Sequence, residues 1–278
     1  MPFRLIPRLD IKGPNLVKGI RLEGLRVLGP PDVFAKTYAE EGADELLYMD
    51  AVASLYGRNS LLDFISRTAK SIFIPITVGG GIRTEADVQQ VLLAGADKVA
   101  VNTAAVESPS LINVLANRFG SSTIVLSIQA KRDGDHWTAY VNNGRDNTGR
   151  DALTWAREGV ERGAGEIIVT AVDREGMGRG LDLELSRAMT FSLPVPVVIC
   201  GGAGSVEDVV AAASVSDAVS VASILHYDLV RQLEADAFDF GSGGEFRIVE
   251  NKRSQSTINP AKVTELKNAL VRNGLESR

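Results

Sequence analysis

Short apolar runs alternate with helix-like segments eight times along this chain of 278 residues, and this rhythm constrains the fold more than any other feature. Most runs are too apolar for a strand with one face in water, as expected where both faces of a parallel sheet are buried. Capping patterns at Thr84 and Ser205 predict two of the intervening helix starts. Eight strand–helix units predict an α/β fold, a (β/α)8 barrel. The expected strands are residues 4–10, 45–50, 74–78, 98–101, 123–129, 166–171, 195–200 and 218–221.

The sequence also repeats itself at a spacing of 121 residues. Two pairs of glycine-containing segments share this spacing: Gly42 with Gly163, and Gly80 with Gly201. Two half-barrels of four units each would produce such a repeat. We therefore expect one domain over residues 1–278, with half-barrels at about 1–121 and 122–278. A doubly wound open sheet is the alternative, but the twofold repeat over eight units favours a closed barrel.

Two stretches interrupt the rhythm. Residues 131–149 contain Asp-Gly at 133–134 and Asn-Gly at 143–144, and so predict a small hairpin excursion. Residues 236–259 are rich in glycine and polar residues, which predicts a long loop before a last barrel helix at 260–273. The loop follows the eighth strand, on the face where barrel enzymes place their chemistry.

Composition restricts the classes of function. The net charge of −5 and the pI near 5.3 argue against a nucleic-acid or membrane-surface partner. Cys200 is the only cysteine, and His136 and His226 are isolated, so neither an intrachain disulfide nor a metal site is expected. The chain start lacks a signal-peptide core and no apolar run is long enough to span a bilayer, which favours a cytoplasmic protein.

Two glycine clusters are candidates for phosphate sites. Gly81 follows the third strand and is joined by Asn102 and Thr103 after the fourth strand. Gly202 and Ser223 follow the seventh and eighth strands, the usual phosphate position in such barrels. Tight turns would also explain the glycines, but two clusters at repeat-related positions favour anion binding by backbone amides. Sites on opposite sides imply a long substrate with a phosphate at each end.

Position 129 bears most directly on the chemistry. Asp10 ends the first apolar run, and Gln129 ends the matching run in the second half, where the pattern leads one to expect an aspartate. Two carboxylates could share acid and base work, whereas an amide exchanges no proton near neutral pH. Asp10 and Lys18 are the better catalytic candidates, because a carboxylate beside an ammonium stays ionised. Further polar residues follow the strands: Asp50, Asn102, Thr170, Asp173 and Glu175.

A second set of charged residues lies at the opposite ends of alternate strands: Arg4, Glu45, Lys98 and Glu166. Strand residues an even number apart point to the same side, so Arg4 shares the inward face with Asp10. Glu45 and Asp50 are an odd number apart, which requires either a bulge or a different pairing. Two cations and two anions could close a ring across the barrel floor. The residues alone favour a stabilising salt-bridge layer over a gate.

Taken together, these residues resemble the HisF family, the cyclase subunits of imidazole glycerol phosphate synthase. The resemblance covers most of the chain outside the 236–259 loop. It is carried by segments 6–12, 17–19, 77–82, 95–99, 101–107, 147–149 and 201–204.

The resemblance implies a barrel built from two half-barrels and a glutaminase partner of the HisH type docked on its floor. Ammonia would pass through the barrel to a bisphosphorylated aminoimidazole-carboxamide ribonucleotide (PRFAR), giving imidazole glycerol phosphate and AICAR. No cofactor is implied. The charged floor residues match the family's ammonia gate, which reverses the preference for a passive layer. Asp97 matches a contact with the glutaminase, and Gly176 matches part of the phosphate site.

The departures from the family cluster at the other end of the barrel. Gln129 replaces the second member of the family's pair of catalytic aspartates, and Glu175 stands where an aspartate is usual. Arg8 replaces a small cysteine two residues before Asp10, on the same inward face. A buried guanidinium there should pair with Asp10 or Asp50, because an unpaired buried charge is very costly. It could also narrow the tunnel.

Three hypotheses remain open from the sequence. The first is an ordinary histidine-pathway cyclase. The second is a paralogue that keeps the ammonia tunnel but serves the amidation of a sugar in surface-polysaccharide synthesis, with a third protein as the amidating enzyme. The third is a binding scaffold without catalysis, which the intact floor ring and the two glycine clusters disfavour.

Overall fold

The computed structural model describes residues 2–51, 61–235 and 257–276. Eight parallel strands form a closed barrel in which the last strand pairs with the first, so the predicted fold class is confirmed. The amino ends of these strands form the floor of the barrel and their carboxyl ends form its mouth. In order around the barrel they are β1 (Arg4–Lys12), β4 (Leu46–Asp50), β5 (Ile76–Gly79), β6 (Lys98–Val101), β7 (Ile124–Asp133), β10 (Glu166–Ala171), β11 (Val197–Cys200) and β12 (Ala218–Val221).

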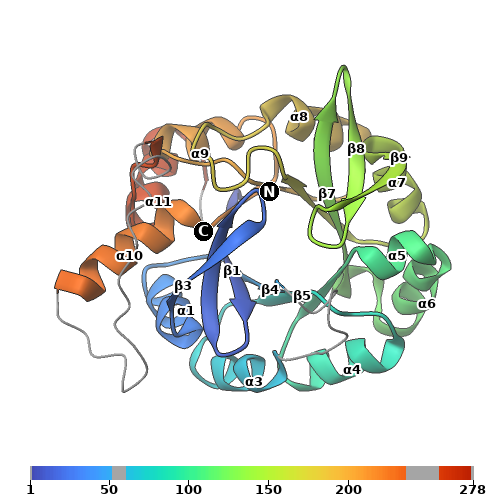
Figure 1. Ribbon diagram of the computed structural model, residues 1–278, viewed down its shortest axis with the longest axis horizontal. Coiled ribbons are helices and arrows are strands. Elements are labelled where there is room, and N and C mark those ends of the chain that lie inside the picture. The colour runs from blue at the N-terminus through green and yellow to red at the C-terminus, as the bar shows by residue number, and fades with distance from the viewer. Residues whose placement is uncertain (1, 52–60, 236–256, 277–278) are drawn as a thin grey trace.

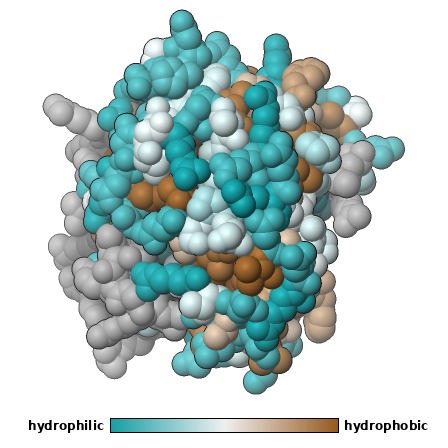
Figure 2. Space-filling view, turned by 90° about the vertical axis from the view of Figure 1, so that its right-hand side faces the viewer, coloured by the Kyte–Doolittle hydropathy of each residue, from teal (hydrophilic) through white to brown (hydrophobic). Residues whose placement is uncertain are grey.

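Helices surround the barrel on all sides (Figure 1). They are α1 (Pro31–Glu40), α3 (Leu62–Ser71), α4 (Glu85–Leu93), α5 (Thr103–Glu107), α6 (Ser110–Phe119), the 3-10 turn η1 (Ser121–Thr123), α7 (Ala152–Glu161), α8 (Leu183–Ser192), α9 (Val206–Ala212), α10 (Ser223–Ala235) and α11 (Val263–Arg272). Their apolar faces pack on the outer side of the barrel and form the main core. The side that carries α5 to α7 is mostly hydrophilic, with small apolar patches (Figure 2).

The capping patterns act as predicted. The Thr84 hydroxyl accepts a hydrogen bond from the Asp87 amide, and the Asp87 carboxylate accepts one from the Thr84 amide. The same reciprocal box, between Ser205 and Asp208, starts α9. Each box satisfies amides that have no partner within the helix, and so fixes where the chain leaves the mouth loop.

Two antiparallel hairpins extend the first strand of each half of the barrel. The predicted excursion after β7 consists of β8 (His136–Val141) and β9 (Asp146–Asp151). A second hairpin, β2 (Asn15–Ile20) with β3 (Glu23–Gly29), follows β1 and was not predicted. Its two-residue turn, Arg21-Leu22, has positive φ at both residues but lacks the asparagine or glycine that usually marks such a turn.

The two hairpin turns meet over the barrel mouth. Asn142 and Asn143 repeat the positive φ angles of Arg21 and Leu22, 121 residues earlier. The Asn143 side-chain amide donates to the Leu22 carbonyl oxygen at 3.0 Å. A Cβ on Gly144 would lie 2.9 Å from a Val172 methyl group, so only glycine fits this close approach.

The strand register carries the same repeat. Asp10 pairs with Met49, and Gln129 pairs with Thr170, which lies 121 residues after Met49. Asp10 and Gln129 therefore occupy equivalent positions in the two halves. The division into half-barrels near residue 121 stays a prediction, as does the extent of the domain.

Most of the predicted loop at 236–259 lies outside the described residues. Its last residues are described: Thr257 donates from its hydroxyl to the Met177 carbonyl oxygen at 2.8 Å, and the Asn259 amide donates to Gly204 at 2.7 Å. The predicted final helix is present as α11. The end of the loop is thus fastened to the mouth of the barrel beside the second glycine cluster.

Candidate functional site: a charged floor and a polar chamber

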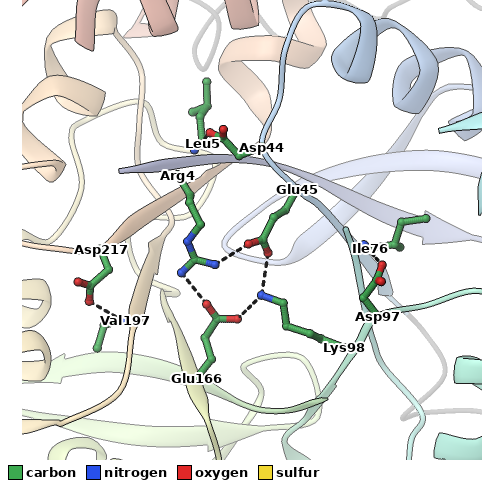
Figure 3. A network of polar contacts seen from close by, with 10 residues as sticks. All are labelled: Arg4, Leu5, Asp44, Glu45, Ile76, Asp97, Lys98, Glu166, Val197 and Asp217. Atoms are coloured by element: carbon green, nitrogen blue, oxygen red, sulfur yellow. Dashed lines mark hydrogen bonds and ion pairs between the residues drawn. The ribbon is translucent and has the colours of Figure 1, made fainter. Parts of the chain in front are cut away.

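The four charged residues of the floor form a closed ring, which we call the floor ring (Figure 3). The Arg4 guanidinium donates to Glu45 and to Glu166, each at 2.6 Å. Lys98 donates to the same two carboxylates at 2.9 and 2.8 Å. Each cation therefore bridges both anions, and the predicted ring is present in its geometry.

The odd spacing between Glu45 and Asp50 needs no bulge. Glu45 lies just before β4, and Leu47 and Met49 continue its alternation toward the apolar layer inside the barrel. Asp50 lies off this inward register. Of the two alternatives that the odd spacing left open, a bulge or a different pairing, the second holds, because Met49 is the residue that shares the inward side with Glu45.

Two members of the floor ring, Arg4 and Glu45, hold their charges at neutral pH. Burial acts to raise the pKa of Glu45, but Lys98 and Arg4 outweigh it and leave that pKa below its usual range. Burial likewise acts to lower the pKa of Arg4, while Glu166 and Glu45 raise it overall. The ring is therefore a locked layer of mutually compensated ions.

Aspartates at the floor bind the first amides of neighbouring strands (Figure 3). Asp97 accepts from the Ile76 amide at 2.8 Å, and Asp217 accepts from the Val197 amide at 2.9 Å. Asp97 is therefore held beside the floor ring by a structural bond of its own. Its contact with a glutaminase stays a prediction.

Above the floor ring, a layer of apolar side chains lies inside the barrel: Ile6, Leu47, Ala100, Val125, Ile168, Val198 and Ala218. Above this layer a cavity opens to the mouth, and we call it the chamber. The chamber collects predicted residues of both kinds, catalytic and phosphate-binding: Asp10, Asp50, Gly81, Asn102, Thr103 and Gln129. Asp10, Asp50 and Gln129 lie in the carboxyl-terminal parts of β1, β4 and β7, and the other three residues follow β5 and β6, as the barrel topology dictates.

The remaining predicted residues lie outside the chamber lining: Lys18, Thr170, Glu175, Gly176, Gly202 and Ser223. Lys18 and Glu175 form a buried ion pair instead. Burial acts to lower the pKa of Lys18, but Glu175 and Asp10 raise it overall, so the ammonium stays protonated. Ser223 is buried at the start of α10.

Arg8 pairs with Asp10, as the sequence indicated. Its Nε donates to Asp10 Oδ1 at 2.8 Å, and its Nη1 donates to Thr170 Oγ1 at 3.2 Å and to Cys200 Sγ at 3.5 Å. Burial raises the pKa of the Cys200 thiol despite the nearby guanidinium, so the thiol stays neutral. Arg8 thus crosses from β1 toward β10 and β11 inside the barrel.

Gln129 holds a hairpin turn. Its Oε1 accepts from the Gly144 amide at 2.7 Å, which ties the turn between β8 and β9 to the chamber wall. Within the described residues its Nε2 has no hydrogen-bond partner. Gln129 can therefore orient a ligand and support the turn, but it moves no proton.

The second glycine cluster has packing reasons of its own. A Cβ on Gly202 would lie 2.3 Å from the Gly180 carbonyl oxygen, and one on Gly176 would lie 2.6 Å from the Gly19 carbonyl oxygen. Both glycines also have positive φ. They let three mouth loops approach closely, and their role in phosphate binding stays a prediction.

His226 is a buried structural residue that links α10 to β1. Its Nε2 donates to the Arg8 carbonyl oxygen at 2.9 Å, and its Nδ1 accepts from the Tyr38 hydroxyl at 2.7 Å. Burial, with Lys18 nearby, lowers the pKa of His226 to about 3. The ring is therefore neutral and fixes the backbone position of Arg8.

Sequence reasoning missed several residues of the chamber wall. Ser127 and Ala100 line its inner end, and the hairpin residues Asn142 and Asn143 line its rim. Ser127 could have been found from its alternation with Gln129. The part of the chain that the structure describes contains no cluster of residues suited to a metal ion, and none of its helices is long and apolar enough to cross a membrane.

Comparison with known proteins agrees with this arrangement. The family described as "Histidine biosynthesis protein" matches residues 4–231. The subunit HisF of imidazole glycerol phosphate synthase from Legionella pneumophila is 55% identical over 206 residues, covering 74% of this chain and 97% of the relative. The corresponding subunit from Myxococcus xanthus is 50% identical, covering 80% and 89%. That from Pyrobaculum aerophilum is 44% identical, covering 88% and 98%. The chain therefore belongs to the family of histidine biosynthesis proteins that includes the HisF subunits.

Proposed function

We propose that this chain is the synthase subunit of an imidazole glycerol phosphate synthase. It receives ammonia from a HisH-type glutaminase and uses it on PRFAR to form imidazole glycerol phosphate and AICAR. The observation that carries the proposal is the closed floor ring at one end of a barrel whose other end opens into a polar chamber. The names of the relatives support the same reaction.

Each end of the barrel performs one task. At the floor, Lys98 is held by single bonds to Glu45 and Glu166, and it can swing away while Arg4 keeps both carboxylates in place. At the mouth, Gly81, Asn102 and Thr103 offer donors to one phosphate of the substrate. Gly176, Gly202 and Ser223 serve the other phosphate, beside the end of the loop at 236–259.

The chemistry requires proton removal from the attacking nitrogen and proton delivery to the departing group. Asp10 is the group best placed to accept a proton, because Arg8 fixes its position at the chamber wall. Asp50 lines the same chamber and is the candidate for the second proton transfer. Lys18 and Glu175 form an ion pair beside Asp10, and the Lys18 ammonium stabilises the negative charge of that carboxylate. Gln129 orients the substrate.

The test is direct. The purified chain is incubated with PRFAR and an ammonium salt, and the formation of imidazole glycerol phosphate and AICAR is measured. Product formation supports the proposal, and its absence contradicts it.

The alternative is a subunit that channels ammonia to a third, sugar-amidating enzyme. The alternative is considered because Arg8 and Gln129 stand at positions where the family has other residues, but the relatives' names favour the cyclase. An inactive protein that becomes a cyclase through Gln129→Asp alone would support the alternative and assign the divergence to this position.

A further inference from the structure

Arg8 fills one side of the barrel interior. Its side chain is fully buried and reaches from β1 toward β10 and β11, where it contacts Thr170 and Cys200. On β12 next to them, Ser220 is 1% exposed, and its hydroxyl has no partner within the described residues. This side of the barrel is therefore packed with side-chain atoms up to the level of Asp10.

The opposite side carries small residues at the equivalent positions. Arg8 pairs with Leu47, and Ser127 pairs with Ile168, which lies 121 residues after Leu47. The register in the same way equates Cys200 with Gly79 and Ser220 with Ala100. The packed side of the interior, formed by β10, β11, β12 and β1, thus presents Arg8, Cys200 and Ser220. At the equivalent positions the other side presents Ser127, Gly79 and Ala100.

The chamber follows this asymmetry. At its inner end it is lined by Met49, Ala100 and Ser127, and by Arg8 on the packed side, whereas Thr170, Cys200 and Ser220 do not line it. Ala100 lies two residues after Lys98 on the same inward face of β6. The inner end of the chamber therefore stands directly above one member of the floor ring.

That member is the most exposed of the four. The Lys98 side chain is 17% exposed, compared with 10% for Arg4, 9% for Glu45 and 7% for Glu166. A lysine on a flexible stem is also easier to displace than an arginine that forks across two carboxylates. The floor ring would therefore open on the side of β6.

Met49 covers the inner end of the chamber. A Cβ added to Gly79 would lie 2.6 Å from Met49 Sδ and 3.1 Å from the Ala100 methyl carbon, so these three residues touch. A methionine side chain is unbranched and adapts its shape at low cost. It can move aside for a small molecule, which a β-branched side chain could not do.

We infer that ammonia follows an off-centre path in this chain, from Lys98 past Ala100 and Ser127, beneath Met49, into the chamber. Arg8 closes the other half of the interior. The Ser127 hydroxyl makes no hydrogen bond within the described residues and faces the chamber, so it offers a donor and an acceptor to a small neutral molecule. This inference rests on the proposed function, because it names the path by which that function is served.

Matched substitutions at repeat-equivalent positions test the path. Ala100→Val and Ser220→Val place the same side chain on the open and the packed side. In the complex with the HisH-type glutaminase of the same genome, the glutamine-driven and the ammonium-driven rates of product formation are compared. For Ala100→Val, and more strongly for Ala100→Leu, the ratio of the two rates should fall about tenfold, because overpacking fills the narrow passage. Ser220→Val should leave it unchanged.

An unchanged ratio in both Ala100 variants, or an equal fall in Ser220→Val, would overturn the inference. If the unmodified protein fails to use ammonium, the proposed function fails instead. A measurement that does not depend on catalysis then tests whether the proposed path for ammonia exists. In crystals of the full chain under xenon pressure, xenon should bind beside Ala100 and Met49, since small apolar cavities take up this gas. Xenon beside Ser220 only, or none at either place, would contradict the path.

Discussion

The barrel carries two layers of buried ions, one at the floor and one at the mouth, and they are built differently. In the floor ring each cation bridges both carboxylates. At the mouth the two cations have separate partners: Arg8 binds Asp10, and Lys18 binds Glu175. In the floor ring a substitution at one residue removes a partner from two others, whereas at the mouth it removes the partner of one. Three positions at which the sequence departs from the pattern expected of the family, Arg8, Gln129 and Glu175, lie at the mouth.

The largest effect is expected for Asp10→Asn. The change removes the chamber carboxylate that Arg8 positions while nearly preserving its shape. Loss of one group from acid–base catalysis typically lowers the rate on the order of 100- to 10,000-fold. Steady-state assays of the ammonium-driven reaction measure it. Asp133→Asn, at an exposed carboxylate of the β7–β8 turn, serves as the control and should keep the rate of the unmodified protein. Equal rates for both variants would remove Asp10 from the chemistry.

Opening the floor ring should cost folding stability. Glu166→Ala leaves Arg4 and Lys98 buried with a single shared carboxylate. Removing one partner of a buried pair typically lowers the free energy of unfolding by about 3–5 kcal/mol. Urea unfolding measures the change. The control is Glu85→Ala, which breaks an exposed pair with Arg118 and should cost about 1 kcal/mol or less. A similar loss in the free energy of unfolding for the two variants would mean that the floor ring stabilises the fold no more than an exposed ion pair does.

Lowering the pH should lower the free energy of unfolding, because His226 is protonated more readily in the unfolded chain. The unfolded chain protonates this histidine near pH 6.5, whereas the folded chain does so only near pH 3. Between these values the unfolded state binds more protons, so the free energy of unfolding falls as the pH decreases. From pH 7 to pH 5 the loss from this residue should be about 2 kcal/mol.

Urea unfolding at both pH values measures this loss, with His226→Gln as the comparison. The variant should show a pH dependence that is smaller by that amount. If its pH dependence equals that of the unmodified protein, His226 is not the group responsible.

The smallest expected effect is a difference in coupling free energy between the two cations of the floor ring and the two cations of the mouth. Double-mutant cycles compare Arg4→Met with Lys98→Met at the floor and Arg8→Met with Lys18→Met at the mouth. Residues that donate to the same carboxylates should show a coupling of about 1 kcal/mol or more, and the mouth pair, whose members donate to different carboxylates, should show a smaller one. A mouth coupling as large as that of the floor would mean that the two layers work alike.

The sequence indicated the barrel and the floor ring because both follow simple periodicities. Alternation of apolar runs gives the strand order, and even spacing places Arg4 below Asp10. The β2–β3 hairpin escaped prediction because Arg21 and Leu22 are not typical turn residues, and their conformation depends on the contact with Asn143. The asymmetry of the interior also could not be read in advance. It depends on which strands face each other across the barrel. It therefore depends on the strand register, which places Arg8 of β1 and Ser127 of β7 at equivalent positions on opposite sides.

In the proposed synthase, ammonia travels through the barrel from floor to mouth. The most direct test supplies the complex with glutamine labelled with ¹⁵N in its amide, together with an excess of unlabelled ammonium. The nitrogen introduced into imidazole glycerol phosphate is then measured by mass spectrometry. We expect product that carries mostly the label from glutamine, because channelled ammonia does not mix with the solution. Label diluted to the proportion in bulk ammonium would contradict it.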